Sequence, residues 1–158
     1  MLVGVGPLLG AGEVGAYVYP TGARTPWTYR AGTVALDGRV WGDGVADPLA
    51  PPPPVAVLTS RLTASAGEAV AVAFRGRPGT RSFGEPTAGV PSHNRVATLR
   101  DGAWLVVTVA QDADRTGRVY GSQEQLFPDR YVTNDWTHAG PADLADDAVL
   151  HAALAWLR

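Results

Sequence analysis

No feature of this 158-residue sequence limits the choice of fold more than a short strand that runs into a capped, apolar helix. Residues 55–60 (VAVLTS) form a continuous apolar run, β-branched at alternate places, which is typical of a strand buried on both faces. Residues 65–68 (SAGE) fit a capping box, and residues 69–74 (AVAVAF) are apolar on nearly all sides, which predicts a buried helix. The glycines within residues 76–79 end this helix.

Further elements after this helix indicate a layered α/β core. Residues 80–85 (TRSFGE) predict a second strand, and the glycine-rich PTAGV that follows predicts a turn. Residues 95–110 predict a hairpin that turns at residues 100–102 (RDG). Residues 146–158 predict an amphipathic helix, with acidic residues first and an arginine last in agreement with the helix dipole. We therefore expect residues 55–158 to form the core of the fold.

The N-terminal third predicts a different kind of structure. Residues 14–46 contain short β-prone runs broken by Gly, Pro and Asp turns, so we expect a β-hairpin excursion from the core. Residues 47–54 (DPLAPPPP) are expected to be a stiff extended connector, because proline lacks a backbone N–H donor. Residues 1–12 are apolar but interrupted by glycine and proline, which predicts neither a membrane span nor a signal peptide. As written, the chain is therefore expected to be soluble and cytoplasmic.

The length and the opening of the chain bear on its domain organisation. A chain of this length can bury one sizeable core. A start on an apolar, glycine-rich stretch without a polar lead-in is typical of the middle of a domain. We therefore expect residues 1–158 to form a single domain that is part of a larger one.

Composition excludes several classes of chemistry. The chain has no cysteine and no lysine, which excludes disulfides, thiolate catalysis and any lysine base within it. Its net charge is -2 and its basic residues, all arginine, are scattered singly, so neither nucleic acid nor an anionic membrane is an expected partner. The histidines lack the spacing of a helical zinc site, no loop is typical of Mg²⁺ or Ca²⁺ binding, and the N-terminal glycines do not match a dinucleotide-binding loop. We therefore expect no metal and no cofactor.

Ser65 lies at the predicted junction between strand and helix, where free backbone N–H groups and the helix dipole converge. A serine in this position could attack a carbonyl, and the N–H of Ala66 could donate to the oxyanion that forms. On the local pattern alone, however, Ser65 followed by Glu68 is an ordinary N-cap pair, and capping is favoured over catalysis.

Three separated motifs resemble a known family in order and spacing. They are residues 63–77 (TASAGEAVAVAFRGR), residues 83–89 (FGEPTAG), and DRTGRVYG with FPD at residues 114–121 and 127–129. Together they resemble the C-terminal processing, or tail-specific, serine peptidases, the last motif matching a later strand of that family. The resemblance implies a crotonase/ClpP-like core of β-β-α units and hydrolysis of a peptide or protein substrate, often near its C-terminus, through an acyl-enzyme.

Taken position by position, the resemblance implies that Ser65 is the nucleophile and that the Ala66 N–H forms half of the oxyanion hole. In the serine-lysine members of the family the base lies in the turn after FGEPTAG, where this sequence has Val90. Asn94 falls where those members carry a supporting glutamine. Without lysine, the sequence is more similar to the branch of tricorn and retinoid-binding proteins, in which a histidine from an earlier segment is the base. The glycine-rich strand that completes the oxyanion hole would precede Met1.

A histidine inside the chain is a second source of the base. His93 is expected in the turn that faces Ser65, and neutral imidazole is suited to general-base catalysis near pH 7. The alternative is a solvated loop histidine, and His138 and His151 are expected to be structural. Glu124 falls near a carboxylate that supports the histidine in the tricorn-like branch, so the resemblance implies an orienting role for it.

Two other functions stay open at this point. The chain could be a catalytically incomplete module that binds a peptide or a hydrophobic ligand in an apolar cleft, which Trp27 and Trp41 could line. It could also be a fragment that needs a partner chain or an N-terminal segment to complete its site.

Overall fold

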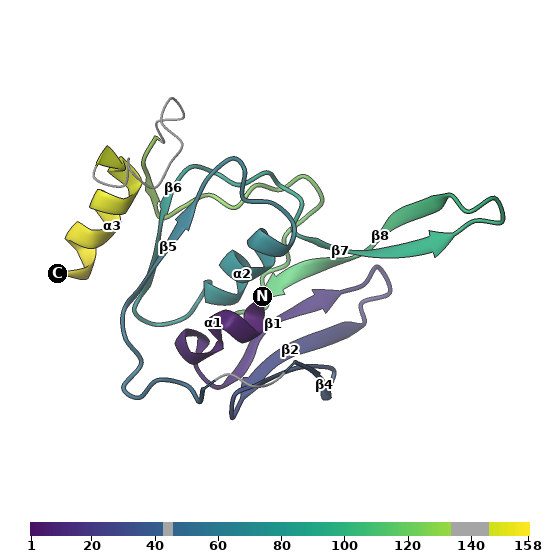
Figure 1. The fold of residues 1–158 in the computed structure, drawn as a ribbon, viewed down its shortest axis with the longest axis horizontal. Coiled ribbons are helices and arrows are strands. Elements are labelled where there is room, and N and C mark those ends of the chain that lie inside the picture. Colours follow the sequence, from purple (N-terminus) through teal and green to yellow (C-terminus); the bar gives the residue numbers. More distant parts are fainter. Residues whose placement is uncertain (43–45, 134–145) are drawn as a thin grey trace.

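Helix α2 lies between two β-sheets in the computed structural model, which describes residues 1–42, 46–133 and 146–158 (Figure 1). In chain order the elements are α1 (Leu2–Leu9), β1 (Gly12–Val18), β2 (Arg24–Arg30), β3 (Thr33–Leu36), β4 (Arg39–Gly42), β5 (Val55–Thr59), α2 (Ala66–Phe74), β6 (Thr80–Gly84), β7 (Ser92–Thr98), β8 (Trp104–Asp114), β9 (Arg130–Tyr131) and α3 (Ala148–Leu157). The larger sheet is antiparallel and the smaller one is parallel. This architecture confirms the expected α/β class.

The larger sheet has the strand order β4-β3-β2-β1-β8-β7, with every neighbouring pair antiparallel. Its first four strands follow one another as a meander, which confirms the hairpins expected over residues 14–46. Strand β1 then pairs with β8, from Gly15 opposite Asp114 to Val18 opposite Gln111. The meander is therefore continuous with the β7–β8 hairpin, and its description as an excursion from the core is corrected.

The main apolar cluster gives the physical reason for this correction. Trp27 and Tyr29 of the meander are buried with Val72 and Phe74 of α2 and with Leu9 of α1. Helix α2 is apolar on nearly all sides and contacts β1 and β8 on one side and β5 on the other. Burying such a helix requires cover from both sheets. The core therefore draws on both parts of the chain.

Gly6 in α1 packs directly against the ring of Tyr29. A Cβ added at Gly6 would lie 2.0 Å from Cε2 of Tyr29, which is 0 % exposed and has no room to move. We expect Gly6→Ala to lower the free energy of unfolding by about 2 kcal/mol in urea denaturation. Gly4→Ala is the matched control in the same helix, because nothing lies within 4 Å of its added Cβ and alanine favours helix. Equal effects of the two substitutions would contradict this packing.

The smaller sheet has the order β5-β6-β9, and α3 packs against β5 and β6. Phe83 of β6 is buried here with Val149 of α3, and Trp156 packs against them. The strand expected over residues 55–60 forms as β5, but the expectation that it is buried on both faces is wrong, since Leu58 is 44 % exposed. Within the described part of the chain, β5 has a neighbouring strand on one side only, which leaves part of its surface to solvent.

Helix α3 confirms the predicted C-terminal helix. Its N-cap residue Asp147 accepts the N–H groups of Val149 (2.8 Å) and Leu150 (2.9 Å) through Oδ1. The helices of the described ranges have 8, 9 and 10 residues, and none of them is long and apolar enough to cross a membrane.

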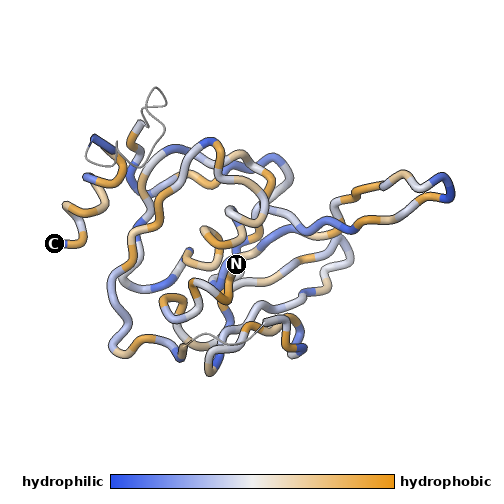
Figure 2. Tube along the Cα trace, in the orientation of Figure 1, coloured by the Kyte–Doolittle hydropathy of each residue, from blue (hydrophilic) through white to orange (hydrophobic). Residues whose placement is uncertain are grey.

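The outer half of the β7–β8 hairpin projects from the body as a two-stranded arm (Figure 1). Figure 2 shows hydrophobic stretches along this arm and a hydrophilic tip. Trp104 and Val106 on the arm are 76 % and 57 % exposed. The hairpin predicted over residues 95–110, with its turn at residues 100–102, is confirmed. Its inner end packs against α2, where β8 becomes buried.

Residues 114–121 resemble a later strand of the family, but apart from Asp114, the last residue of β8, they do not form one. Val119 makes an isolated bridge with Ala113. Instead, the segment turns around the carboxylate of Asp114, whose Oδ1 accepts the N–H of Thr116 (2.8 Å) and whose Oδ2 accepts the hydroxyl of Tyr120 (2.8 Å). These local hydrogen bonds take the place of a strand ladder, which corrects the sequence interpretation.

Candidate active site

Ser65 occupies a strained turn between β5 and α2. Its φ is 50° and its ψ is -113°, a combination that residues other than glycine rarely adopt. The serine is exposed, although the helix that follows it is largely buried. Sharp strand-to-helix turns of this kind present the nucleophilic serine of α/β-hydrolases.

Glu68 fixes this turn from the first turn of α2. Its side chain is 0 % exposed, and its Oε2 accepts the N–H of Ser65 (2.8 Å) and of Val90 (2.9 Å). Its Oε1 accepts the N–H of Gly89 (2.8 Å) and the hydroxyl of Thr87. Four donors to one carboxylate offset the cost of burying its charge. The glutamate of the expected capping box therefore also ties the FGEPTAG turn to the serine.

The start of α2 is suited to stabilise negative charge. Ala66 is the first residue of the helix, so its N–H has no acceptor within the helix. The N-terminal end of the helix also carries a partial positive charge. Beside it, Val90 is 44 % exposed and has an apolar side chain that cannot act as a base. The geometry thus offers a donor for an oxyanion, but no base at the position where serine-lysine members have one.

Ser65 and Ala66 line a cavity of about 410 Å³ together with side chains of the meander and of the β7–β8 hairpin. Trp27 and Trp41 are among these residues, as the sequence predicted for a cleft. Trp27 is fully buried behind the surface, whereas Trp41 is 76 % exposed. Apolar side chains complete much of the wall, among them Leu2, Val3, Val34, Leu36 and Val70. The meander therefore forms one wall of the site.

His93 and Asn94 line the same cavity, but from a strand and not from the expected turn. They lie on β7 where its pairing with β8 shifts register. The imidazole of His93 stacks on the ring of Tyr17, with centroids 4.4 Å apart. Burial, and to a smaller extent the charge of Arg95, lowers the pKa of His93, which keeps the ring neutral near pH 7. The Asn94 Oδ1 accepts the hydroxyl of Thr108 (2.8 Å).

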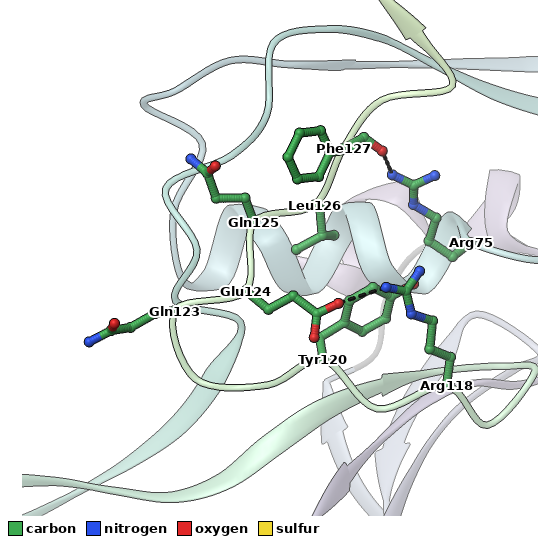
Figure 3. Close-up of a pocket in the computed structure, with 8 residues that line it drawn as sticks. All are labelled: Arg75, Arg118, Tyr120, Gln123, Glu124, Gln125, Leu126 and Phe127. Carbon is green, nitrogen blue, oxygen red and sulfur yellow. Dashed lines mark hydrogen bonds and ion pairs between the residues drawn. The ribbon is translucent and has the colours of Figure 1, made fainter.

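Glu124 is not brought to this cavity. It lines a separate cavity of about 430 Å³, where its carboxylate lies next to the guanidinium of Arg118 (Figure 3). Its Oε1 accepts a hydrogen bond from Arg118 (2.6 Å), and its Oε2 accepts the N–H of Gly121 (2.7 Å). The Gly121 hydrogen bond, followed by the contact with Arg118, lowers the pKa of Glu124. Its partners are thus Arg118 and Gly121, and no described contact joins it to a histidine.

The other two histidines are not among the described residues that line the cavity. His151 is exposed on α3, and the structural role expected for it stays a prediction. His138 lies outside the described residues. Of the histidines that the structure describes, His93 is the one that lines the cavity.

Asp112, which sequence reasoning missed, also lines the cavity of Ser65. It is 1 % exposed, and its Oδ1 has no hydrogen-bond partner in the described ranges. Burial, and then the charge of Glu68, raises the pKa of the Asp112 carboxyl to about 7. The predicted hairpin ended at residue 110, and the local sequence gave no sign that β1 and α2 would enclose the next residues of β8.

A serine at a strained strand-to-helix turn, beside a helix start and an apolar cavity, is typical of hydrolases that use a serine nucleophile. Comparison with known proteins identifies the family. Residues 17–132 match peptidase family S41, and the chain belongs to this family. The resemblance to C-terminal processing peptidases is therefore confirmed.

Three relatives show how far the likeness extends. The nisin-resistance protein of Lactococcus lactis subsp. lactis is 32% identical over 135 residues, which are 85% of this chain and 42% of that protein. The structure of a lipoprotein from Streptococcus agalactiae matches with a TM-score of 0.68 and 25% identity, over 99% of this chain and 48% of that chain. The photosystem II D1 C-terminal processing protease matches with a TM-score of 0.54 and 25% identity, over 83% of this chain and 30% of that chain. The chain thus spans less than half the length of each.

Proposed function

We propose that this chain carries the nucleophile of a serine-type peptidase with a crotonase-like core, and that Ser65 forms an acyl-enzyme with its substrate. The observation that carries the proposal is the strained backbone of Ser65, φ 50° and ψ -113°, at the start of a helix and at the wall of a cavity. Strain of this kind persists at functional sites because the surrounding structure holds it in place, here through Glu68.

The proposed reaction proceeds in two steps. The Ser65 hydroxyl gives its proton to a base while its oxygen attacks the scissile carbonyl carbon, and the N–H of Ala66 donates to the oxyanion. The intermediate collapses as the C–N bond breaks and the base returns the proton to the leaving amine. Water then attacks the acyl-enzyme in the same way and releases the acid. The substrate is a peptide or protein that enters the apolar cavity of the meander.

The base has two candidate sources. His93 lines the cavity of Ser65 and is neutral near pH 7, as a general base must be. Its ring stacks on Tyr17, and no hydrogen bond among the described residues joins it to Ser65. The longer relatives have room for the second source, a histidine outside the matched region. We favour the second source, because a general base must form a hydrogen bond with the serine hydroxyl, and His93 forms none with Ser65 among the described residues.

Labelling with a fluorophosphonate probe tests the proposal. We expect the full-length protein to be labelled, and Ser65→Ala in that protein to remain unlabelled, as read by intact mass. His93→Ala is compared with His151→Ala, an exposed histidine on α3 that serves as control. Loss of labelling in His93→Ala alone would name His93 as the base. Equal labelling of wild type and Ser65→Ala would overturn the assignment of the nucleophile.

A binding module that does not cleave its ligand is the second candidate function. Its supporting observation is the apolar wall of the cavity, which includes Trp27, Leu36 and Trp41. A peptide that binds wild type and Ser65→Ala equally, with no turnover and no labelling in either, would support this function instead.

A further inference from the structure

The Asp112 carboxyl lines the cavity of Ser65, and one of its oxygen atoms is unpaired within the part of the chain that the structure describes. Its side chain is 1 % exposed, and the Oδ1 atom accepts no hydrogen bond within the described residues. The backbone around it is rigid, because the Asp112 N–H donates to the Pro91 carbonyl (3.1 Å) and its own carbonyl accepts the N–H of Tyr120 (2.9 Å). Buried polar atoms in folded proteins are almost always paired, so this carboxylate oxygen is open to a partner other than the described residues, such as water or a ligand.

The groups known to interact with this carboxyl are either negatively charged, as it is, or neutral near pH 7. The titratable groups that interact with it are Tyr17 on β1 and Glu68 on α2, and His93 on β7 lines the same cavity. Burial, and then the charge of Asp112, raises the pKa of Tyr17 to about 12. Burial, and then the charge of Glu68, also raises the pKa of the Asp112 carboxyl. Among the residues that the structure describes, no arginine and no terminal amine forms an ion pair with Asp112. A cation is therefore the partner that would complement the charged form of this carboxyl.

The residues that line the cavity are suited to bind a cation at the end of an apolar side chain. The rings of Tyr17, Trp27 and Trp41 line the cavity, and aromatic faces attract ammonium and guanidinium groups. The methylenes of a long basic side chain would pack on Leu36 and its apolar neighbours. The indole Nε1 of Trp27 is a second buried atom of the lining that has no hydrogen-bond partner among residues 1–42, 46–133 and 146–158. Its N–H could donate to a carbonyl, so a peptide residue offers both missing partners.

We propose that this cavity binds a lysine or arginine side chain of the substrate, with the Asp112 carboxylate as the acceptor for its charged end. Because Ser65 lines the same cavity, the basic residue lies next to the bond that is cut; this part of the proposal rests on the proposed peptidase function. Asp112 is then the residue that determines specificity, and it takes no part in bond breaking.

Binding of small probes to the chain tests the proposal without any cleavage. The probes are N-acetyl-lysine amide, N-acetyl-arginine amide and the uncharged isostere N-acetyl-norleucine amide, followed by NMR chemical shifts of the tryptophan indoles. We expect the basic probes to bind in the millimolar range and about tenfold more tightly than norleucine. In Asp112→Asn this preference should fall to about twofold or less. Equal binding of lysine and norleucine, an unchanged preference in Asp112→Asn, or no binding of any probe would overturn the proposal.

Two further measurements make the result of this binding experiment interpretable. Ser65→Ala should retain the preference for basic probes, so a failure of the peptidase proposal and a failure of the specificity proposal are distinguishable. If Asp112→Asn does not fold, a ¹³C NMR titration of the Asp112 carboxyl in the wild type replaces it. The lysine probe should then lower the pKa of that carboxyl, because a nearby cation favours its charged form. A pKa that is unchanged at saturating probe would also overturn the proposal.

Discussion

Glu68→Ala is expected to lower the free energy of unfolding by about 3–5 kcal/mol and to abolish fluorophosphonate labelling of Ser65. The substitution leaves the N–H groups of Ser65, Gly89 and Val90 and the hydroxyl of Thr87 without their acceptor. All four lie next to the strained turn, so the turn should relax towards ordinary helix-cap geometry. Urea denaturation followed by circular dichroism measures the stability, and intact mass measures the labelling.

Two comparisons separate this effect from the loss of any carboxylate. Glu13→Ala removes an exposed ion pair with Arg24 and is expected to change stability by no more than about 0.5 kcal/mol. Glu68→Gln keeps the side-chain volume and one acceptor oxygen, so it should lower the free energy of unfolding by an amount between those of Glu13→Ala and Glu68→Ala. If Glu68→Ala were as mild as Glu13→Ala, the carboxylate would not be holding the turn.

Asp112→Asn is expected to stabilise the fold by about 4 kcal/mol at pH 8 and to have little effect near pH 4. The pKa of this carboxyl is raised from 3.8 to about 7 in the folded chain, first by burial and then by Glu68. The folded state therefore holds its proton more tightly than the unfolded state does. Its contribution to stability is complete below about pH 4 and is lost as the pH rises to about 7, whereas asparagine has no proton to lose.

Urea denaturation at a series of pH values measures this difference. The control is Asp101→Asn in the exposed turn of the β7–β8 hairpin, where solvent screens the charge and the two stability curves should run parallel. A difference between Asp112→Asn and wild type that stays constant from pH 4 to pH 8 would contradict the raised pKa. A fold that retains such a costly carboxyl is consistent with a functional role for it.

The local elements of this fold were predictable because their signals lie within a few residues of one another. The capping box, the apolar run of α2 and the parallel strands on either side are set by caps, periodicity and turn residues, and the structure has them where the sequence predicted them. The same holds for the hairpin turn at residues 100–102. The position of Ser65 at the start of a buried helix follows from this local pattern alone.

Which residues form the site depended on the pairing of strands that are far apart in the sequence, and no local pattern predicts such pairing. The ladder between β1 and β8 joins residues almost a hundred positions apart, and it decides that the meander is part of the core. It also carries Asp112 and His93 to the cavity of Ser65, while Glu124 remains with Arg118 in a separate cavity. Strand pairing over such distances depends on which apolar faces can cover each other, and that is a property of the whole chain.

The sequence by itself therefore determined the helix, its cap and the serine in front of it, because backbone hydrogen bonding and side-chain periodicity act over a few residues. Only the tertiary structure decided which groups face that serine. The need to cover α2 on both sides brought the meander and β8 against it. It thereby buried a carboxyl that lines the same cavity as the serine and whose Oδ1 has no hydrogen-bond partner among the described residues.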